Sequence, residues 1–282
     1  MPVTIGGLER AGAQRLAHCS PTPGLDAALL LAFVLGRPRI ALIAHATDPV
    51  APADERHFLD LIERRVRHEP VAYLTGRKEF FGREFAVTPA VLIPRPESEL
   101  LVERAMEILA GRTDAVVIDL GTGSGCLAIS IALECAARGA PVRMIASDVC
   151  AAALEIARTN ARNLGASVEF RAGRWLEVAG VGERFDLIVA NPPYIEPGDR
   201  RVSPELAFEP PGALYAGDAG CADLLAIMAA APAHLQPGGS VLLEIGAGQG
   251  EELRTRAPFP VEIRRDLADR ERLLEGRPQS PR

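Results

Sequence analysis

Apolar residues recur at helical spacing through the first 75 residues, with no strand-like alternation. The segment 25–35 is almost entirely apolar, with Asp26 placed to cap its first turn and Gly36 placed to end it. A second segment, 53–68, sets apolar residues among charged ones at the same spacing. The pattern predicts a small helical domain over residues 1–75.

The pattern changes between residues 76 and 96. Short runs of alternating apolar residues are broken there by Gly82 and Pro89, which indicates a hairpin-like connector. Pro94 and Pro96 discourage a helix until the connector ends.

From residue 97 onward, strand-like and helical patterns alternate. The predicted strands are 115–120, 142–147, 168–171, 185–190, 240–245, 261–265 and 270–274. The predicted helices are 99–110, 124–138, 151–163 and 222–235. Such alternation implies a mostly parallel sheet covered by helices on both faces. We therefore predict a doubly wound, seven-stranded, Rossmann-like α/β domain over residues 97–282, after the helical domain and its connector.

Composition excludes several classes of protein. The chain has 282 residues, which favours more than one domain, and its 48% hydrophobic and 24% charged residues are typical of a soluble globular protein. The net charge of −6 provides no general attraction to a nucleic-acid backbone. We therefore expect no direct nucleic-acid partner.

The cysteines are odd in number and include no C-x-x-C pair. This favours free thiols in a reducing compartment over a disulfide framework or a metal cluster. The sequence also shows no basic leader before a long apolar run and no uncharged apolar stretch long enough to span a bilayer. We expect a cytoplasmic protein without a membrane segment and without a metal site.

A glycine-rich segment, Asp-Leu-Gly-Thr-Gly-Ser-Gly, joins the first strand of the sheet to a helix. Its backbone N–H groups and the following helix N-terminus are suited to a ligand. Because Cys126 follows, the dinucleotide fingerprint G-x-G-x-x-G is not met. The segment indicates a nucleoside-containing cofactor, with a merely tight turn as the alternative. The candidate cofactor-binding residues here are Gly121, Thr122, Gly123, Ser124 and Gly125.

Asp148 stands at the end of the second predicted strand of the sheet. Ligands of open α/β sheets bind beyond the carboxyl ends of the strands, where an acidic residue can accept hydrogen bonds from both ribose hydroxyls. A helix N-cap is the alternative role. Asp148 joins the candidate cofactor-binding set.

The segment Asn-Pro-Pro-Tyr follows strand 185–190. Its prolines fix the backbone, so that the Asn191 side-chain oxygen and the Pro192 carbonyl can point at one spot, and Tyr194 can lie flat against a planar group. Such a clamp suits a planar –NH2 nitrogen conjugated to a carbonyl or a ring. Asn191, Pro192 and Tyr194 are candidate catalytic residues, Pro193 completes the candidate substrate-binding set, and Asn191 is also assigned to the cofactor set.

Together these motifs resemble class I S-adenosylmethionine-dependent methyltransferases that act on an amino group conjugated to a π system. Two segments narrow the resemblance to the bacterial peptide chain release factor glutamine methyltransferases: Phe-Phe-Gly-Arg-Glu-Phe-Ala-Val at 80–87 and Val-Leu-Ile-Pro-Arg-Pro-Glu-Ser-Glu at 91–99. Further similar segments lie at 26–30, 69–76, 209–214 and 243–246, so the resemblance covers nearly the whole chain.

The resemblance implies S-adenosyl-L-methionine as cofactor and class I peptide chain release factors as protein partners. The methyl group is expected on the side-chain amide nitrogen of the glutamine in their Gly-Gly-Gln motif. The resemblance also implies that Trp175 packs on the cofactor. The sequence departs from the family at Arg174, where Asp is common, and at Ser98, where Thr is common.

Two alternatives remain at this stage. A nucleic-acid adenine or guanine methyltransferase would use the same Asn-Pro-Pro-Tyr clamp, but the acidic balance and the single lysine disfavour it. A nucleotide-dependent dehydrogenase or an inactive cofactor-binding module is disfavoured by the glycine spacing. For the helical domain over residues 1–75, the resemblance implies recognition of the protein substrate, while the sequence alone is equally compatible with a domain that only shields the sheet.

Overall fold

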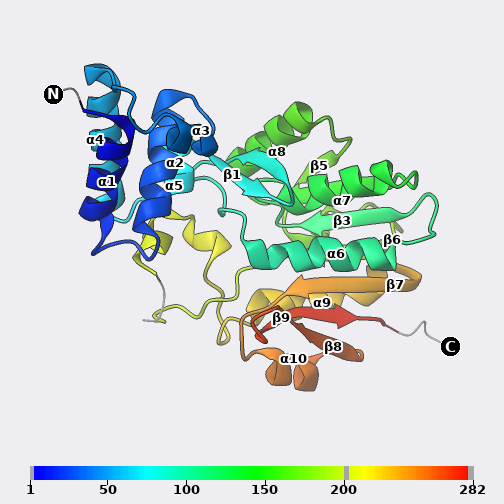
Figure 1. Ribbon diagram of the computed structural model, residues 1–282. Coiled ribbons are helices and arrows are strands. Elements are labelled where there is room, and N and C mark those ends of the chain that lie inside the picture. The colour runs from blue at the N-terminus through cyan, green and yellow to red at the C-terminus, as the bar shows by residue number, and fades with distance from the viewer. Residues whose placement is uncertain (1–2, 200–202, 279–282) are drawn as a thin grey trace. The chain divides into compact units, whose positions relative to one another are not determined.

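The computed structural model describes residues 3–199 and 203–278, so the outermost residues of the predicted domains lie outside the described ranges. The chain divides into two compact units, coloured from blue to red along the sequence in Figure 1. The first unit, called the helical unit here, holds the residues up to Arg77 together with Ser203–Phe208. The second, called the sheet unit, holds Lys78 and the residues after it without that short segment.

Helices build the helical unit around an aliphatic core. They are α1 (Ile5–Leu16), α2 (Pro23–Leu35), α3 (Arg39–Ala44), α4 (Pro52–Val66) and α5 (Val71–Thr75). Two of them, α2 and α4, match the predicted segments, and Gly36 ends α2 in the left-handed conformation, as predicted. At Gly12 of α1 an added Cβ would lie 2.6 Å from the ring of Phe58, so glycine permits the close approach of α1 and α4.

The predicted capping role of Asp26 is wrong. Thr22 precedes the first residue of α2, and the Asp26 side chain lies inside the unit instead. Its carboxylate accepts hydrogen bonds from Arg65 Nε at 2.8 Å, Ser20 Oγ at 2.8 Å and Thr22 Oγ1 at 3.1 Å. A partner 39 residues away in the sequence therefore determines where Asp26 points.

Arg65 also joins the segment Ser203–Phe208 to the helices of the helical unit. Its Nη2 donates to Glu205 Oε1 at 2.5 Å, and Glu205 lies in the 3₁₀ helix η3 (Pro204–Phe208). The Arg65 side chain is only 3% exposed. This buried guanidinium is therefore paired with two carboxylates.

The sheet unit contains the predicted seven-stranded, mostly parallel sheet, in the order β5-β4-β3-β6-β7-β9-β8. Its strands are β3 (Val116–Leu120), β4 (Arg143–Asp148), β5 (Glu169–Ala172), β6 (Phe185–Ala190), β7 (Leu235–Glu244), β8 (Val261–Arg265) and β9 (Glu271–Gly276). β9 runs antiparallel to both of its neighbours, β7 and β8, and the pairings among β5, β4, β3, β6 and β7 are parallel. The predicted doubly wound α/β class is confirmed.

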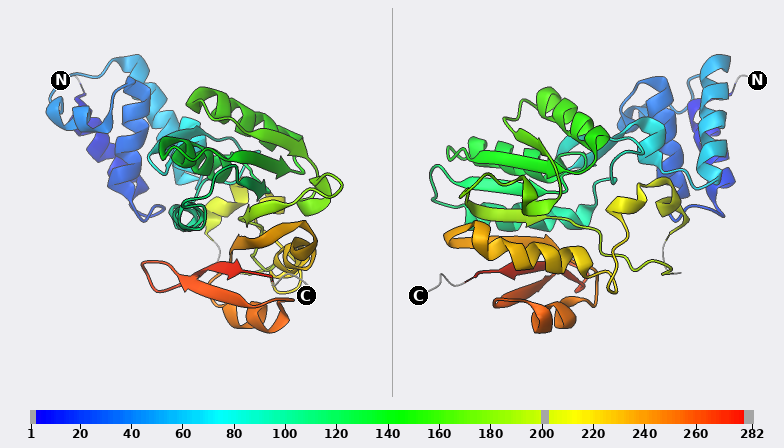
Figure 2. Two further views of the ribbon diagram at one scale, coloured as in Figure 1. Left: turned by 90° about the vertical axis from the view of Figure 1, so that its right-hand side faces the viewer. Right: turned by 180° about the vertical axis from the view of Figure 1, so that it is seen from behind.

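Helices cover both faces of the sheet (Figure 2). On one face pack α6 (Glu99–Ile108), α7 (Cys126–Ala137) and α8 (Ala151–Leu164), and on the other α9 (Ala222–His234) and α10 (Gly250–Arg256). Alternate residues of β3 and β6 supply the two cores, as period-2 strands require. The helix α10 and the early start of β7 at Leu235 were not predicted.

The predicted connector contains a two-stranded hairpin, β1 (Arg77–Phe80) and β2 (Arg83–Ala86). Phe80 and Phe85 are fully buried in the core that contains α6 and α7. Its aromatic side chains thereby anchor the hairpin to the sheet unit.

Candidate active site

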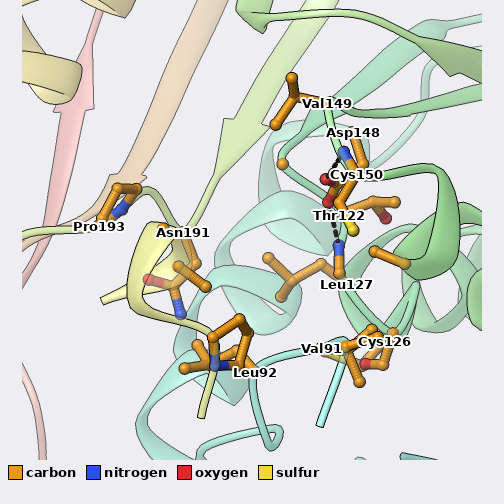
Figure 3. Close-up of a pocket in the computed structure, with 18 of the residues that line it drawn as sticks. Val91, Leu92, Thr122, Cys126, Leu127, Asp148, Val149, Cys150, Asn191 and Pro193 are labelled. Carbon is orange, nitrogen blue, oxygen red and sulfur yellow. Dashed lines mark hydrogen bonds between the residues drawn. The ribbon is translucent and has the colours of Figure 1, made fainter. Parts of the chain in front are cut away.

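The strand register brings the predicted motifs to one edge of the sheet. Leu120 of β3 pairs with Ser147 of β4 and with Ala190 of β6, so the residues that follow these strands leave the sheet side by side. A cavity of about 580 Å³ lies at this edge, a size suited to a nucleoside-containing ligand. Figure 3 shows Asp148 and Asn191 among the residues that line it.

Most predicted site residues line this cavity. They are Gly121, Thr122, Gly123, Ser124, Asp148, Trp175, Asn191 and Pro193. The other predicted site residues, Gly125, Pro192 and Tyr194, are described by the structure but are not among the lining residues.

The glycine-rich segment needs glycine for both conformation and space. Gly121 has a φ of 71°, and an added Cβ would lie 3.0 Å from the ring of Trp175. Gly125 precedes α7 with a φ of 83°, and its added Cβ would lie 2.9 Å from Ile129. The segment is therefore closely packed against an aromatic wall on one side and a helix on the other.

Asp119 is in β3, directly before the glycine-rich turn, and its side chain is fully buried. Burial raises its pKa to about 7, although the hydroxyl of Thr122 donates to Oδ2 at 2.6 Å and opposes the shift. The charge of Asp148 also raises the pKa of Asp119.

Asp148 holds the backbone of the site and still has acceptor capacity. Its carboxylate accepts the N–H groups of Gly123 at 2.9 Å and Cys150 at 2.8 Å, bonds that are dashed in Figure 3. A carboxylate offers about four lone-pair positions, so further hydrogen bonds from a ligand are available to it. Asp148 is not the N-cap of α8, because Cys150 occupies that position.

Asp223 of α9 fixes the wall formed by Trp175. Its Oδ1 accepts the indole N–H of Trp175 at 3.1 Å and Arg174 Nη2 at 2.8 Å. Arg174, the departure noted in the sequence, is thus paired with a carboxylate that also lines the cavity. Sequence reasoning missed Asp223, for which no local motif gives a signal.

A chain of hydrogen bonds lies behind Asn191. Asn191 Nδ2 donates to Ser98 Oγ at 3.1 Å, and Ser98 Oγ donates to Glu244 Oε2 at 2.5 Å. The other oxygen of Glu244 accepts the hydroxyl of Tyr194 at 3.1 Å. Burial raises the pKa of Glu244, while its two hydroxyl partners act in the opposite direction. Sequence reasoning gave Ser98 and Glu244 no role, although both lie in segments that carried the family resemblance.

Gln249, which lies between β7 and α10, fixes the backbone at Tyr194. Gln249 Nε2 donates to the carbonyls of Tyr194 and Ala219, both at 3.2 Å, and its Oε1 accepts Gly246 N–H at 2.8 Å. At Gly220 an added Cβ would lie 2.2 Å from the carbonyl oxygen of Tyr194. These contacts fix the backbone that carries the Asn-Pro-Pro-Tyr motif.

A third part of the cavity wall comes from the segments 90–95 and 210–215. Glu209 joins them, because its carboxylate accepts the backbone N–H of Ile93 at 3.0 Å and pairs with Arg95. Glu209 is 3% exposed, so this link is buried.

Two family models match the chain. Residues 8–76 match the PrmC N-terminal domain, and residues 96–208 match the methyltransferase small domain. The boundary between the two matched regions lies close to that between the two units of the structure.

Several relatives are similar over nearly their whole length, and all are named release factor glutamine methyltransferase. The protein of Bordetella pertussis is 47% identical, over 90% of this chain and 94% of its own. That of Burkholderia pseudomallei is 44% identical, over 95% and 96%. That of Salmonella typhimurium is 39% identical, over 92% and 93%.

Solved structures show the same fold at low sequence identity. A methyltransferase from Pyrococcus furiosus matches with a TM-score of 0.52 at 19% identity, over 76% of this chain and 97% of its own. A T. Thermophilus 16S rRNA N2 G1207 methyltransferase, solved with AdoMet and guanosine, matches with a TM-score of 0.52 at 20% identity, over 72% of this chain and 50% of its own.

Within residues 3–199 and 203–278, no helix has the length and apolar character needed to cross a bilayer.

Proposed function

The chain belongs to the release factor glutamine methyltransferase family, and we propose that it methylates the Gly-Gly-Gln glutamine of class I peptide chain release factors. The methyl group comes from S-adenosyl-L-methionine and is attached to the side-chain amide nitrogen. Similarity across both units to relatives with this one name is the observation that carries the proposal.

The residues around the cavity fit the cofactor. Asp148 has acceptor capacity for ribose hydroxyls, Gly121 leaves room beside the ring of Trp175, and Trp175 presents an aromatic wall. When bound, S-adenosylmethionine supplies a methyl group on a positively charged sulfur, already activated for transfer. The remaining task of the protein is to align and stabilise the amide nitrogen.

An amide nitrogen is a poor nucleophile because its lone pair is delocalised into the carbonyl group. Asn191 is proposed to counter this by accepting a hydrogen bond from one amide proton through Oδ1. An acceptor so placed favours a pyramidal nitrogen and stabilises the positive charge that develops on it. Asn191 lines the cavity, and its Nδ2 is already engaged by Ser98, which leaves Oδ1 for the substrate.

The Pro192 carbonyl is proposed as the acceptor for the second amide proton. Pro192 stands between two lining residues, Asn191 and Pro193. Tyr194 donates its hydroxyl to Glu244 and is only partly exposed, so its proposed contribution includes holding the motif as well as offering a ring face.

The helical unit is proposed to bind the release factor, with the reaction taking place in the cytoplasm, where translation occurs. The PrmC N-terminal domain match over residues 8–76 supports a role specific to this family. A nucleic-acid substrate is not favoured, because the net charge is −6 and the chain has one lysine. The likeness to an rRNA methyltransferase concerns the fold alone.

A label-transfer assay tests the proposal. The full chain is incubated with methyl-labelled S-adenosylmethionine and, in separate reactions, a class I release factor, the same factor with its Gly-Gly-Gln glutamine replaced by alanine, and ribosomal RNA. We expect label in the unmodified release factor alone. Label confined to RNA would overturn the proposal.

A further inference from the structure

Ser98 is the central member of the buried hydrogen-bond chain behind Asn191. It lies at the end of the 3₁₀ helix η1 (Pro96–Ser98), Asn191 follows β6, and Glu244 ends β7. Packing of these three elements brings together side chains that are 93 and 146 residues apart in the sequence. Ser98 is 2% exposed and Glu244 is 1% exposed, so bulk water does not compete for these bonds.

When Glu244 is ionised, chemistry fixes the direction of each hydrogen bond in this chain. An ionised carboxylate only accepts hydrogen bonds, so Glu244 takes the hydroxyl protons of both Ser98 and Tyr194. A hydroxyl has a single proton, so Ser98 has none left to donate toward Asn191. Ser98 Oγ can therefore only accept from Asn191, which requires the NH2 group of the carboxamide to face it.

We propose that Ser98, with its proton committed to Glu244, is a positioning residue that sets the orientation of the Asn191 carboxamide. With Nδ2 held by Ser98, Oδ1 is turned to the substrate amide, where an acceptor is needed. The reversed carboxamide would present a donor to a nitrogen that carries two protons of its own. This inference rests on the proposed function, since it concerns the acceptor used on the substrate glutamine.

The surroundings of Glu244 suit this role better than a purely structural one. In the described part of the chain, no arginine or lysine lies within ion-pair distance of its carboxylate, and its direct partners are two hydroxyls. Arg272 is near enough to lower the pKa of Glu244, and Glu97 raises it. A buried carboxylate with neutral partners is costly for folding, whereas its strict acceptor character is what fixes the Ser98 proton.

Steady-state kinetics on the full chain with a release factor test the proposal. Ser98→Ala is expected to lower kcat roughly tenfold, the effect of one lost hydrogen bond, with little change in KM for either substrate. Ser98→Thr, which keeps the hydroxyl, should retain most of the activity, and Ser98→Cys, a weak donor, should fall between the two. Glu244→Leu should also lower kcat, because it removes both acceptors and frees the Ser98 proton to point at Asn191.

The Asn191→Ala background separates positioning from general damage. If Ser98 and Glu244 act through Asn191, their substitutions will cause no further loss of kcat there. Ser130→Ala is the matched control, since Ser130 is a fully buried serine of α7 outside the cavity wall, and it should leave kcat unchanged. Thermal unfolding of each variant identifies any that fail to fold, and Ser98→Cys then replaces Ser98→Ala in the comparison.

The outcomes also separate the two proposals. A wild-type chain that fails to methylate the release factor overturns the proposed function. A wild-type chain that does so, with Ser98→Ala or Glu244→Leu keeping full kcat or losing as much in the Asn191→Ala background as alone, overturns only the positioning role.

Discussion

Asp26 in the helical unit and Glu244 in the sheet unit are both buried carboxylates, but they have different partners. Asp26 pairs with the buried guanidinium of Arg65 and accepts two hydroxyls. Glu244 accepts two hydroxyls and has no such ion pair among the described residues. Each carboxylate loses its hydration on folding, but only Asp26 gains an opposite charge in exchange.

The difference separates a pair that stabilises the fold from a group for which we propose a role in the reaction. Removing one member of the Asp26–Arg65 pair leaves a charge without its partner, so the main cost is in stability. Glu244 instead anchors hydrogen bonds that end at Asn191, so interference there is expected to affect catalysis. Substitutions at the buried pair and around Asn191 test this division.

Arg65→Met should have the largest effect, lowering the free energy of unfolding by about 3–5 kcal/mol because Asp26 stays buried without its cation. Urea unfolding followed by circular dichroism measures the change. The matched control is Arg15→Met, whose partner Glu63 is 48% exposed and whose loss should matter much less. Equal effects of the two substitutions would contradict the special status of the buried pair.

The double variant Asp26→Leu with Arg65→Met tests whether the loss of stability in Arg65→Met comes from the unpaired Asp26 charge. Replacing both charges with apolar side chains removes the fully buried unpaired charge and leaves only the partly exposed Glu205 without its cation, so stability should recover part of the way to the wild-type value. Unfolding under the same conditions as for the single variant measures the recovery. A double variant no more stable than Arg65→Met would show that the pair does more than neutralise itself.

Asn191→Ala should lower kcat on the order of 10²- to 10³-fold, by analogy with the loss of one oxyanion-hole donor. The free energy of unfolding should change little, because Asn191 is only partly buried. Turnover with a release factor measures the loss. Asn163→Ala, which removes an exposed asparagine of α8, should keep wild-type turnover, and an equally active Asn191→Ala would refute the proposed role.

The raised pKa of Asp119 predicts that the stability of the sheet unit depends on pH. Its pKa is about 7 when folded and near 3.8 in its ordinary state, so between these values the unfolded chain releases a proton that the folded chain retains. Stability conferred by Asp119 therefore falls as pH rises, by about 1.4 kcal/mol per pH unit between about pH 5 and 6 and by about half of that slope at pH 7. Unfolding of wild type and Asp119→Asn across this range measures the difference, and parallel pH curves would contradict the raised pKa.

Gly121→Ala should weaken S-adenosylmethionine binding by roughly tenfold. The new methyl group would lie 3.0 Å from the ring of Trp175 and press on the cavity wall, whereas the left-handed backbone strain, about 1–2 kcal/mol for a non-glycine residue, lowers stability and not affinity. Calorimetric titration measures the dissociation constant. Gly82→Ala carries a similar positive φ with no neighbour within 4 Å and lies outside the cavity, so it should bind the cofactor normally.

Local patterns predicted the parts of the molecule whose causes are local. Asp148 ends a strand, the glycine segment and the Asn-Pro-Pro-Tyr motif each follow one, and parallel strands with right-handed connections bring such ends together. Gly36 ended its helix as predicted, because the left-handed conformation is a property of the residue itself.

The sequence pattern did not predict features that depend on contacts between residues far apart in the chain. Asp26 reads as a helix cap, and only the folded unit reveals Arg65 beside it. The helix α1 contains three glycines that lower its intrinsic propensity, so contacts such as that of Gly12 with Phe58 stabilise it instead. Ser98, Asp223 and Glu244 belong to no motif with a local physical signature, and their roles follow from packing between separate elements.

The most direct test of the central claim is to locate the methyl group. A class I release factor treated with the full chain and S-adenosylmethionine is digested, and tandem mass spectrometry maps the modified atom. We predict one added methyl on the side-chain amide nitrogen of the Gly-Gly-Gln glutamine, with a strongly reduced yield for Asn191→Ala. A methyl group on any other residue, or an unmodified release factor alongside methylated RNA, would contradict it.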